Sequence, residues 1–234
     1  MKKIFSFLVV ILLISSCTQD IKDNTPAFQA TKDNALWKAG DASVHIEEDG
    51  SVTITAYRDY ETIVLSLSDA EVGTYYFGSQ NQSSYAEYSY NDETTSLLLD
   101  TDIYPGPVYQ LKQIVNAGTN YLDSNNSLTQ FAVSSPSNGS GLRLAIEANP
   151  EGAVTSASII SRGDGYYPGD VVTIVGGDNN ATVSILNTQL SHGQVVIEKI
   201  ENGMFTGSFT FSATDGNGNV ASFSDGYFYR LPIR

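Results

Sequence analysis

Apolar and polar residues alternate at every second position along much of the chain. The alternation recurs in residues 43–47, 51–57, 61–68, 85–90, 193–200 and 205–214. In residues 51–57, for example, Val52, Ile54 and Ala56 are separated by polar neighbours. A period of two is typical of strands with one buried face, and Asp49-Gly50 marks a hairpin turn between two such runs. No stretch keeps an apolar period of 3.6 residues beyond two turns, so the sequence predicts an all-β fold.

The first seventeen residues follow a different pattern. Lys2 and Lys3 precede an apolar run, and small residues come before Cys17, the only cysteine. This layout is typical of a bacterial secretory signal peptide. Residues 14–17 (ISSC) resemble the lipobox of bacterial lipoproteins, which implies that Cys17 is acylated and becomes the new N-terminus. An ordinary signal peptide is the alternative, but a lone cysteine in an exported chain would have no disulfide partner, which favours the lipoprotein.

Charge and composition limit the partners of the exported part. Residues 18–26 are polar and without periodicity, which predicts a flexible tether. Without Lys2 and Lys3, ten basic residues stand against twenty-six acidic ones, a formal net charge of −16. Such a chain repels nucleic acid and anionic lipid. We therefore expect no nucleic-acid partner. We expect the protein to be attached to the outer membrane through its N-terminal lipid, on either the surface or the periplasmic face.

Several short motifs carry a resemblance to a known family. They are Trp37, Gly73-Thr74-Tyr75, residues 193–197 (GQVVI), residues 206–211 (TGSFTF) and residues 225–228 (DGYF). In this order they resemble a family of small lipoproteins of unknown function from Flavobacterium-like bacteria (phylum Bacteroidota). The resemblance covers roughly residues 28–90 and 191–234. It implies an antiparallel β-sandwich in the cell envelope, and it implies no reaction.

The middle of the chain departs from that pattern. Residues 159–174 (IISRGDGYYPGDVVTI) resemble a G-x-G-Y-x-x-G-D-x-V-T-I β-module that recurs in phage structural and extracellular proteins. The spacing Gly118-x-x-Tyr121 matches Gly163-x-x-Tyr166, which suggests two degenerate repeats of one unit, each a glycine turn covered by a tyrosine. We therefore predict a discontinuous sandwich, residues 27–98 and 190–234, that carries an inserted β-module at 99–189.

The chain offers little for catalysis. Only His45 and His192 are ordinary bases at neutral pH, and no catalytic or phosphate-binding motif occurs. Residues 215–219 (DGNGN) match the opening of a calcium loop, but Val220 and Gly226 stand where that loop needs Gly and Glu. We expect no catalytic residue, no cofactor and no metal site, with weak structural calcium left open.

Tyrosines with nearby carboxylates are the remaining candidates for binding. In the predicted insert these are Tyr121, Tyr166, Tyr167, Asp164 and Asp170. Aromatic faces beside polar groups suit sugars and also suit protein partners, although alternating tyrosines also shield sheet faces. The sequence thus predicts a non-enzymatic lipoprotein whose inserted module binds a glycan or an envelope protein. A structural spacer or assembly component of the envelope is the alternative.

Overall fold

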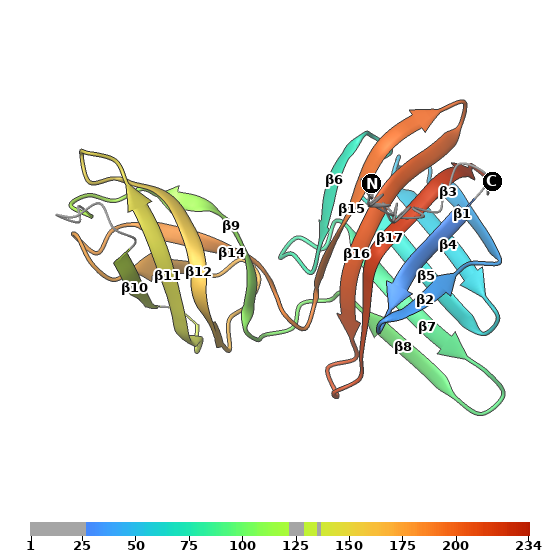
Figure 1. The fold of residues 1–234 in the computed structure, drawn as a ribbon, viewed down its shortest axis with the longest axis horizontal. Coiled ribbons are helices and arrows are strands. Elements are labelled where there is room, and N and C mark those ends of the chain that lie inside the picture. Colours follow the sequence, from blue (N-terminus) through green and yellow to red (C-terminus); the bar gives the residue numbers. More distant parts are fainter. Residues whose placement is uncertain (1–26, 122–128, 135–136) are drawn as a thin grey trace, which may run out of the picture.

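A computed structural model describes residues 27–121, 129–134 and 137–234. The predicted signal peptide, Cys17 and the tether lie outside these residues. All regular structure in the described part consists of strands, which confirms the predicted all-β class. Over the same residues, no helix is long and apolar enough to cross a membrane. The strands form two lobes joined by a narrow waist (Figure 1).

The large lobe is an 11-stranded antiparallel sheet folded into two layers. The first layer contains β1 (Ala27–Lys32), β2 (Ala35–Lys38), β6 (Gly73–Phe77), β15 (His192–Glu201), β16 (Met204–Thr214) and β17 (Val220–Pro232). The second contains β3 (Asp41–Ile46), β4 (Val52–Arg58), β5 (Glu61–Leu67), β7 (Tyr85–Asn91) and β8 (Ser96–Asp100). The layers are linked through Thr214 and Asp100 at one edge and through a bridge between Val44 and Ile233 at the other. This is the predicted β-sandwich.

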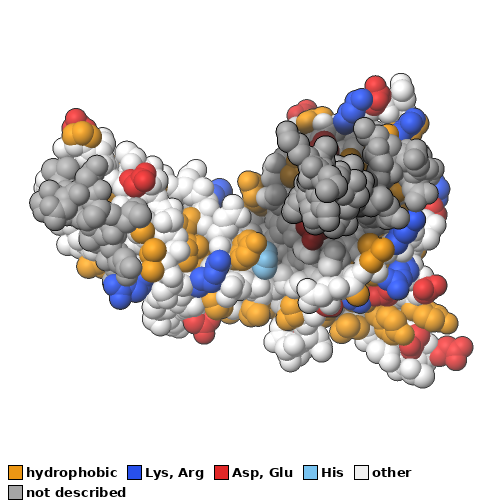
Figure 2. Space-filling view, viewed as in Figure 1, with side chains coloured by type: hydrophobic (Ala, Val, Ile, Leu, Met, Phe, Trp, Pro, Cys, Tyr) orange, Lys and Arg blue, Asp and Glu red, His pale blue; other side chains and the backbone are white. Residues whose placement is uncertain are grey.

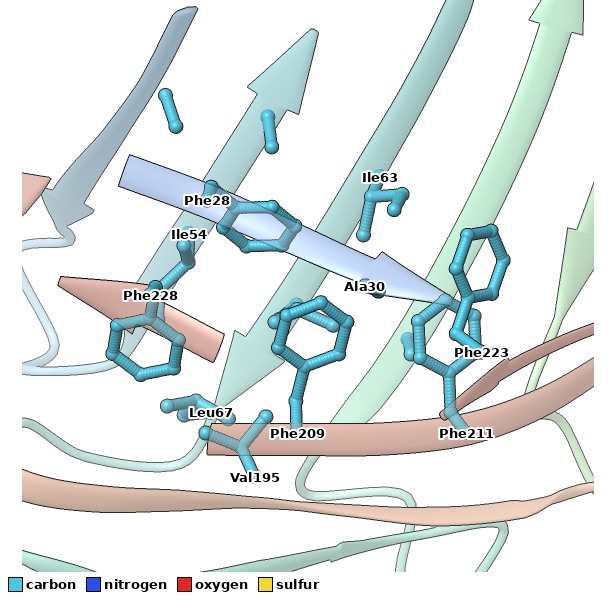
Figure 3. Packing of buried hydrophobic residues seen from close by; sticks show 14 of the residues in the cluster. Phe28, Ala30, Ile54, Ile63, Leu67, Val195, Phe209, Phe211, Phe223 and Phe228 are labelled. Atoms are coloured by element: carbon cyan, nitrogen blue, oxygen red, sulfur yellow. The ribbon is translucent and has the colours of Figure 1, made fainter. Parts of the chain in front are cut away.

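The core of the large lobe lies between these layers (Figure 3). Phenyl rings from β1, β16 and β17 stack in pairs, with centroids 4.7 Å apart for Phe28 and Phe209 and 4.6 Å apart for Phe211 and Phe223. The alternating side chains Ile54 and Ile63 pack against them from β4 and β5. The period-two pattern of the sequence therefore marks the buried face of each layer.

The small lobe is a six-stranded antiparallel sheet with a hydrophobic core of its own. Its strands are β9 (Val108–Asn116), β10 (Thr129–Ser134), β11 (Ser140–Ala148), β12 (Val154–Asp164), β13 (Val171–Ile174) and β14 (Thr182–Thr188). β12 lies beside β9, and Arg162 Nη1 joins these two edge strands by donating to the Val108 and Tyr109 carbonyls at 2.7 and 2.8 Å. The insert is predicted at residues 99–189, but its first two residues, Leu99 and Asp100, belong to β8 of the large lobe.

The two ends of the small lobe lie side by side. Val108 pairs with Thr188, and the Gln189 amide donates to the Pro107 carbonyl at 2.8 Å. Because its two ends lie close together, the small lobe can be inserted into a loop of the large lobe without disturbing the sheet of the large lobe.

The small lobe has a pseudo-two-fold arrangement. Its strands form two units, β9–β11 and β12–β14, in which β9 corresponds to β12, β10 to β13 and β11 to β14. The strand order in the sheet is β12-β11-β10-β13-β14-β9. Replacing each strand by its counterpart gives the same order read from the other end. The pairing register follows the same symmetry. Leu144 of β11 pairs with Ile159 of β12, as Val183 of β14 pairs with Ile114 of β9.

The two Gly-x-x-Tyr motifs occupy equivalent places in these units. Their glycines have positive φ angles of 65° and 60°. The Tyr121 hydroxyl accepts a hydrogen bond from the Ala181 amide at 3.0 Å, and the Tyr166 hydroxyl accepts one from the Leu142 amide at 3.3 Å. Each tyrosine thus reaches from its own unit into the other, and the pair of contacts joins the two halves of the small lobe.

Candidate functional site

A cleft of about 430 Å³ opens between the two lobes. Its walls come from β6 and the loop that follows it in the large lobe, and from β9, β13 and β14 in the small lobe. Figure 1 shows that loop reaching toward the small lobe, and Figure 2 shows the waist between the lobes. A volume of this size falls in the range of small-molecule sites.

The large-lobe wall is rich in hydroxyl, amide and phenol groups. It includes Tyr75, Tyr76, Ser79, Gln80, Asn81 and Ser83. Tyr75 is anchored, because its hydroxyl lies in hydrogen-bond contact with the Asp69 carboxylate and 2.9 Å from the Glu71 carbonyl. Burial and the hydrogen bond to Asp69 raise the pKa of Tyr75 to about 12, so the phenol stays neutral. Tyr76 is 39% exposed and is open to a ligand.

The small-lobe wall combines apolar side chains with one cation. It includes Lys112, Gln113, Val115, Val171, Ile185 and Leu186. Val115 and Val171 are exposed although they are hydrophobic. The cleft therefore offers hydrogen-bonding groups on one side and exposed apolar groups on the other.

No carboxylate belongs to the lining of this cleft, although acidic side chains are spread over both lobes (Figure 2). The two aspartates adjacent in sequence to lining residues are engaged elsewhere. Asp69 accepts hydrogen bonds from Ser68 and Tyr75, and the hydrogen bond from Tyr75 contributes most to the lowered pKa of Asp69. Asp170 accepts hydrogen bonds from the Ser137 hydroxyl at 2.7 Å and the Tyr167 amide at 3.0 Å.

Direct contacts across the waist hold the cleft walls together. Asn187 Nδ2 donates to the Phe77 carbonyl at 3.1 Å. The His192 ring stacks on Tyr109 with centroids 3.6 Å apart. Burial lowers the pKa of His192 to about 4, so the imidazole is neutral at physiological pH and serves as a packing surface at the waist.

Of the five binding residues expected from the sequence, two lie in the core of the small lobe. Tyr121 is 4% exposed and Tyr166 is fully buried. Their hydroxyls bond to backbone groups of the opposite unit, so these side chains do not present a surface to a ligand. Their physical role is to cover glycine turns and to join the two units.

The other three residues lie near the turn between β12 and β13. Asp164 is exposed, and Tyr167 is 44% exposed. Asp170 and Tyr167 close a tight turn through two hydrogen bonds, the Asp170 amide donating to the Tyr167 carbonyl and the Tyr167 amide to the Asp170 carboxylate. The intervening Gly169 lines the cleft beside Gln80. This turn thus borders the cleft.

The residues that line the cleft were not among the binding residues predicted from the sequence. Residues 79–84 (SQNQSS) are a polar stretch between two strands, which is the one available signal for the large-lobe wall. Lys112 carries no motif. Its position depends on the pairing of β9 with β14, which the sequence alone does not reveal.

The aspartate of the DGNGN loop stabilises its own turn. The Asp215 carboxylate accepts hydrogen bonds from the Asn217 and Asn219 amides at 2.8 and 3.2 Å and from Asn219 Nδ2 at 2.7 Å. These contacts define an Asx-type turn. Over the described residues, no group of three or more His, Cys, Asp or Glu side chains is placed to hold a metal ion.

A second polar cluster links the two layers of the large lobe at its edge. Glu61 of β5 accepts hydrogen bonds from Lys32 Nζ at 2.6 Å, from Trp37 Nε1 at 2.9 Å and from the Tyr88 hydroxyl at 2.6 Å. Burial alone would raise the pKa of Glu61, but the hydrogen bonds from Lys32 and Tyr88 outweigh it and lower that pKa. Lys32, Trp37 and Tyr88 each have Glu61 as a partner, and Lys32 also donates to Tyr88, so we assign this cluster to stability.

Comparison with known proteins places the chain in a family. Residues 24–108 and 159–232 match the Domain of unknown function (DUF6252). No curated protein and no solved structure matches the chain. The match includes all strands of the large lobe. It also includes residues 91–108 and 159–190, so the expected departure from the family over all of residues 91–190 is wrong. The segment with the second Gly-x-x-Tyr motif lies inside the family domain, and the unmatched segment between the two matched ranges is residues 109–158. The chain therefore belongs to the DUF6252 family.

Proposed function

We propose that this protein is a non-enzymatic binding protein, lipid-anchored to the cell envelope through Cys17, that holds a glycan in the cleft between its lobes. The observation that carries the proposal is the lining of the cleft, in which phenol, amide and hydroxyl groups face exposed aliphatic side chains. Sugars have the same two kinds of surface, hydroxyl edges and apolar C–H faces, and aromatic and amide side chains match both. A ligand at the waist would contact both lobes at once.

The proposal is tested by retention of the purified protein on a panel of immobilised glycans. Tyr76→Ala and Gln80→Ala remove exposed groups of the cleft wall, and each is expected to weaken retention about tenfold, equivalent to about 1.4 kcal/mol. Tyr57→Ala is the matched control, because Tyr57 is an exposed tyrosine of β4 outside the cleft. Equal retention of all four proteins would overturn the cleft as the binding site. If no glycan retains the protein, the structural spacer becomes the better account.

Attachment and orientation need a separate measurement. We expect the tagged protein in the membrane fraction and the Cys17→Ser variant in the soluble fraction, because acyl chains on Cys17 would supply the attachment. A Cys17→Ser variant that stays with the membrane would contradict lipid anchoring. Digestion of the tagged protein by protease on intact cells would place it on the outer surface, and protection until lysis would place it in the periplasm.

A further inference from the structure

We propose that the ligand of the cleft is an acidic saccharide, and that Lys112 binds its carboxylate. The proposal rests on the proposed function and names the ligand class for that site. Two independent observations support it: the charge distribution of the cleft, and a local departure of the small lobe from its own symmetry.

The charge distribution favours an anionic ligand. The exported chain has a formal net charge of −16, yet the cleft lining contains one lysine and no carboxylate. Lys112 is exposed and takes part in none of the ion pairs found among the described residues. A cation without a protein counter-ion, beside neutral hydrogen-bonding groups, is arranged to receive a negative charge from outside.

The symmetry of the small lobe supplies the second observation. Each residue of β9 has a counterpart in β12 about 45 positions later. The correspondence follows from the pairing: Ile114 pairs with Val183 of β14 as Ile159 pairs with Leu144 of β11. Both strands share one bulge, at Val115 in β9 and at Ile160 in β12, where a residue is skipped in the pairing. This shared bulge is a property of the repeated unit.

A second bulge of β9 lies at the cleft, and further bulges lie outside the cleft lining, at Tyr109 in β9 and at Thr155 in β12. Ser184 pairs with Gln113 and Ile185 with Leu111, so Lys112 is an extra residue in β9. In the counterpart, Ala145 pairs with Ser158 and Ile146 with Ala157, with no residue skipped.

The strand facing Lys112 departs from the symmetry at the same place. In β14, Leu186 is skipped between Ile185 and Asn187, whereas the corresponding Ile146 and Glu147 of β11 pair without interruption. Both Lys112 and Leu186 line the cleft. Bulges re-aim side chains and are frequent beside binding sites, so the bulges at Lys112 and Leu186 re-aim side chains of the cleft wall, its one cation among them.

The other walls define what carries the negative charge. Val115 and Val171 provide apolar contact near Lys112, and Gln80 and Asn81 provide amide groups from the large lobe. A ligand that matches all three kinds of group needs a carboxylate, hydroxyls and an apolar ring face. A uronic acid residue combines these groups in one sugar ring.

The test uses matched pairs of oligosaccharides. The probes are uronate trisaccharides of the pectin, alginate and hyaluronan types, each paired with its carboxyl-reduced, neutral counterpart. The full-length protein is compared with Lys112→Gln, Lys112→Arg and Lys199→Gln by biolayer interferometry at low and high salt. Lys199 is the control, because it is an exposed lysine of β15 outside the cleft. Thermal melting of each variant checks that the fold is intact.

We expect at least one acidic trisaccharide to bind about tenfold more tightly than its neutral counterpart at low salt. Lys112→Gln should remove that preference, while Lys112→Arg and Lys199→Gln should keep it. Equal binding of acidic and neutral members would overturn the acidic ligand but leave the proposed glycan binding intact. A preference that survives in Lys112→Gln would overturn the role of Lys112. Binding of neither member of any pair would overturn this inference, and the glycan panel with Tyr76→Ala would then decide the proposed function separately.

Discussion

At the residue scale, the Gly-x-x-Tyr motifs show why particular residue types are needed in the small lobe. A Cβ atom at position 118 would lie 2.6 Å from the Ala181 amide, and one at position 163 would lie 2.5 Å from the Leu142 amide. These are the same amides that donate to the two tyrosine hydroxyls. Only glycine allows the backbone to approach so closely with a positive φ angle.

Gly163→Ala is therefore expected to destabilise the small lobe by about 1–3 kcal/mol, because it adds backbone strain and a steric clash. Gly50→Ala is the matched control, since Gly50 also has a positive φ angle but open space around it. Urea unfolding of both variants tests the difference. A cost for Gly163→Ala no larger than that for Gly50→Ala would show that the close approach is unimportant.

Tyr121→Phe tests the hydroxyl contacts of the motif. The Tyr121 hydroxyl donates to the Ile174 carbonyl at 2.8 Å and accepts from the Ala181 amide at 3.0 Å, both buried. Its removal should cost about 1–3 kcal/mol, because buried backbone groups lose a partner. Tyr167→Phe, at an exposed position of the same lobe, should leave the free energy of unfolding unchanged within about 0.5 kcal/mol. Similar costs for the two variants would contradict the structural role of Tyr121.

At the scale of elements, the cluster around Glu61 joins β1 and β2 of one layer to β5 and β7 of the other. Burial would raise the pKa of Glu61, but the hydrogen bonds from Lys32 and Tyr88 outweigh it and lower that pKa. Burial would lower the pKa of Lys32, but its hydrogen bonds to Glu61 and Tyr88 outweigh it and raise that pKa. The stabilisation by Glu61 is therefore present above its ordinary pKa of 4.5 and is lost as the pH falls. The stabilisation by Lys32 is present below 10.5 and is lost as the pH rises through its raised pKa.

Glu61→Gln should destabilise the large lobe by about 1–3 kcal/mol at neutral pH, because three donors lose a charged acceptor. The lowered pKa of Glu61 predicts that the natural protein loses stability as the pH falls below 4.5, and the variant should lack this contribution to the loss. Denaturant unfolding at pH 3, 5 and 7 tests both expectations. Parallel pH curves for variant and natural protein would show that Glu61 does not contribute to the acid sensitivity.

The elements also show how far the sequence could predict this protein. Alternation such as Val52, Ile54 and Ala56 predicted the strands and the buried face, because a half-buried strand imposes a period of two. Equal spacing of the two Gly-x-x-Tyr motifs pointed to a repeated unit. The burial of Tyr166 and the position of Lys112 were beyond the sequence, because both depend on cross-strand pairing and on bulges that a single strand does not reveal.

At the scale of the whole molecule, two lobes with separate hydrophobic cores meet at a waist. Because each core is built by its own sheet, we expect two unfolding transitions in calorimetry. Tyr121→Phe should lower only the transition of the small lobe, and Glu61→Gln only that of the large lobe. A single transition lowered by both variants would contradict separate lobes.

The waist is also where the proposed ligand would lie, and its position can be mapped directly. The ¹⁵N-labelled protein is titrated with the acidic trisaccharide that binds most tightly, and changes in amide chemical shift are followed for each residue. The account predicts that the largest changes fall at residues 79–81, 112–115, 169–171 and 184–186, on both walls of the cleft. Changes confined to one lobe, or gathered on the outer face around Tyr57, would contradict the claim that this protein binds its ligand between its lobes.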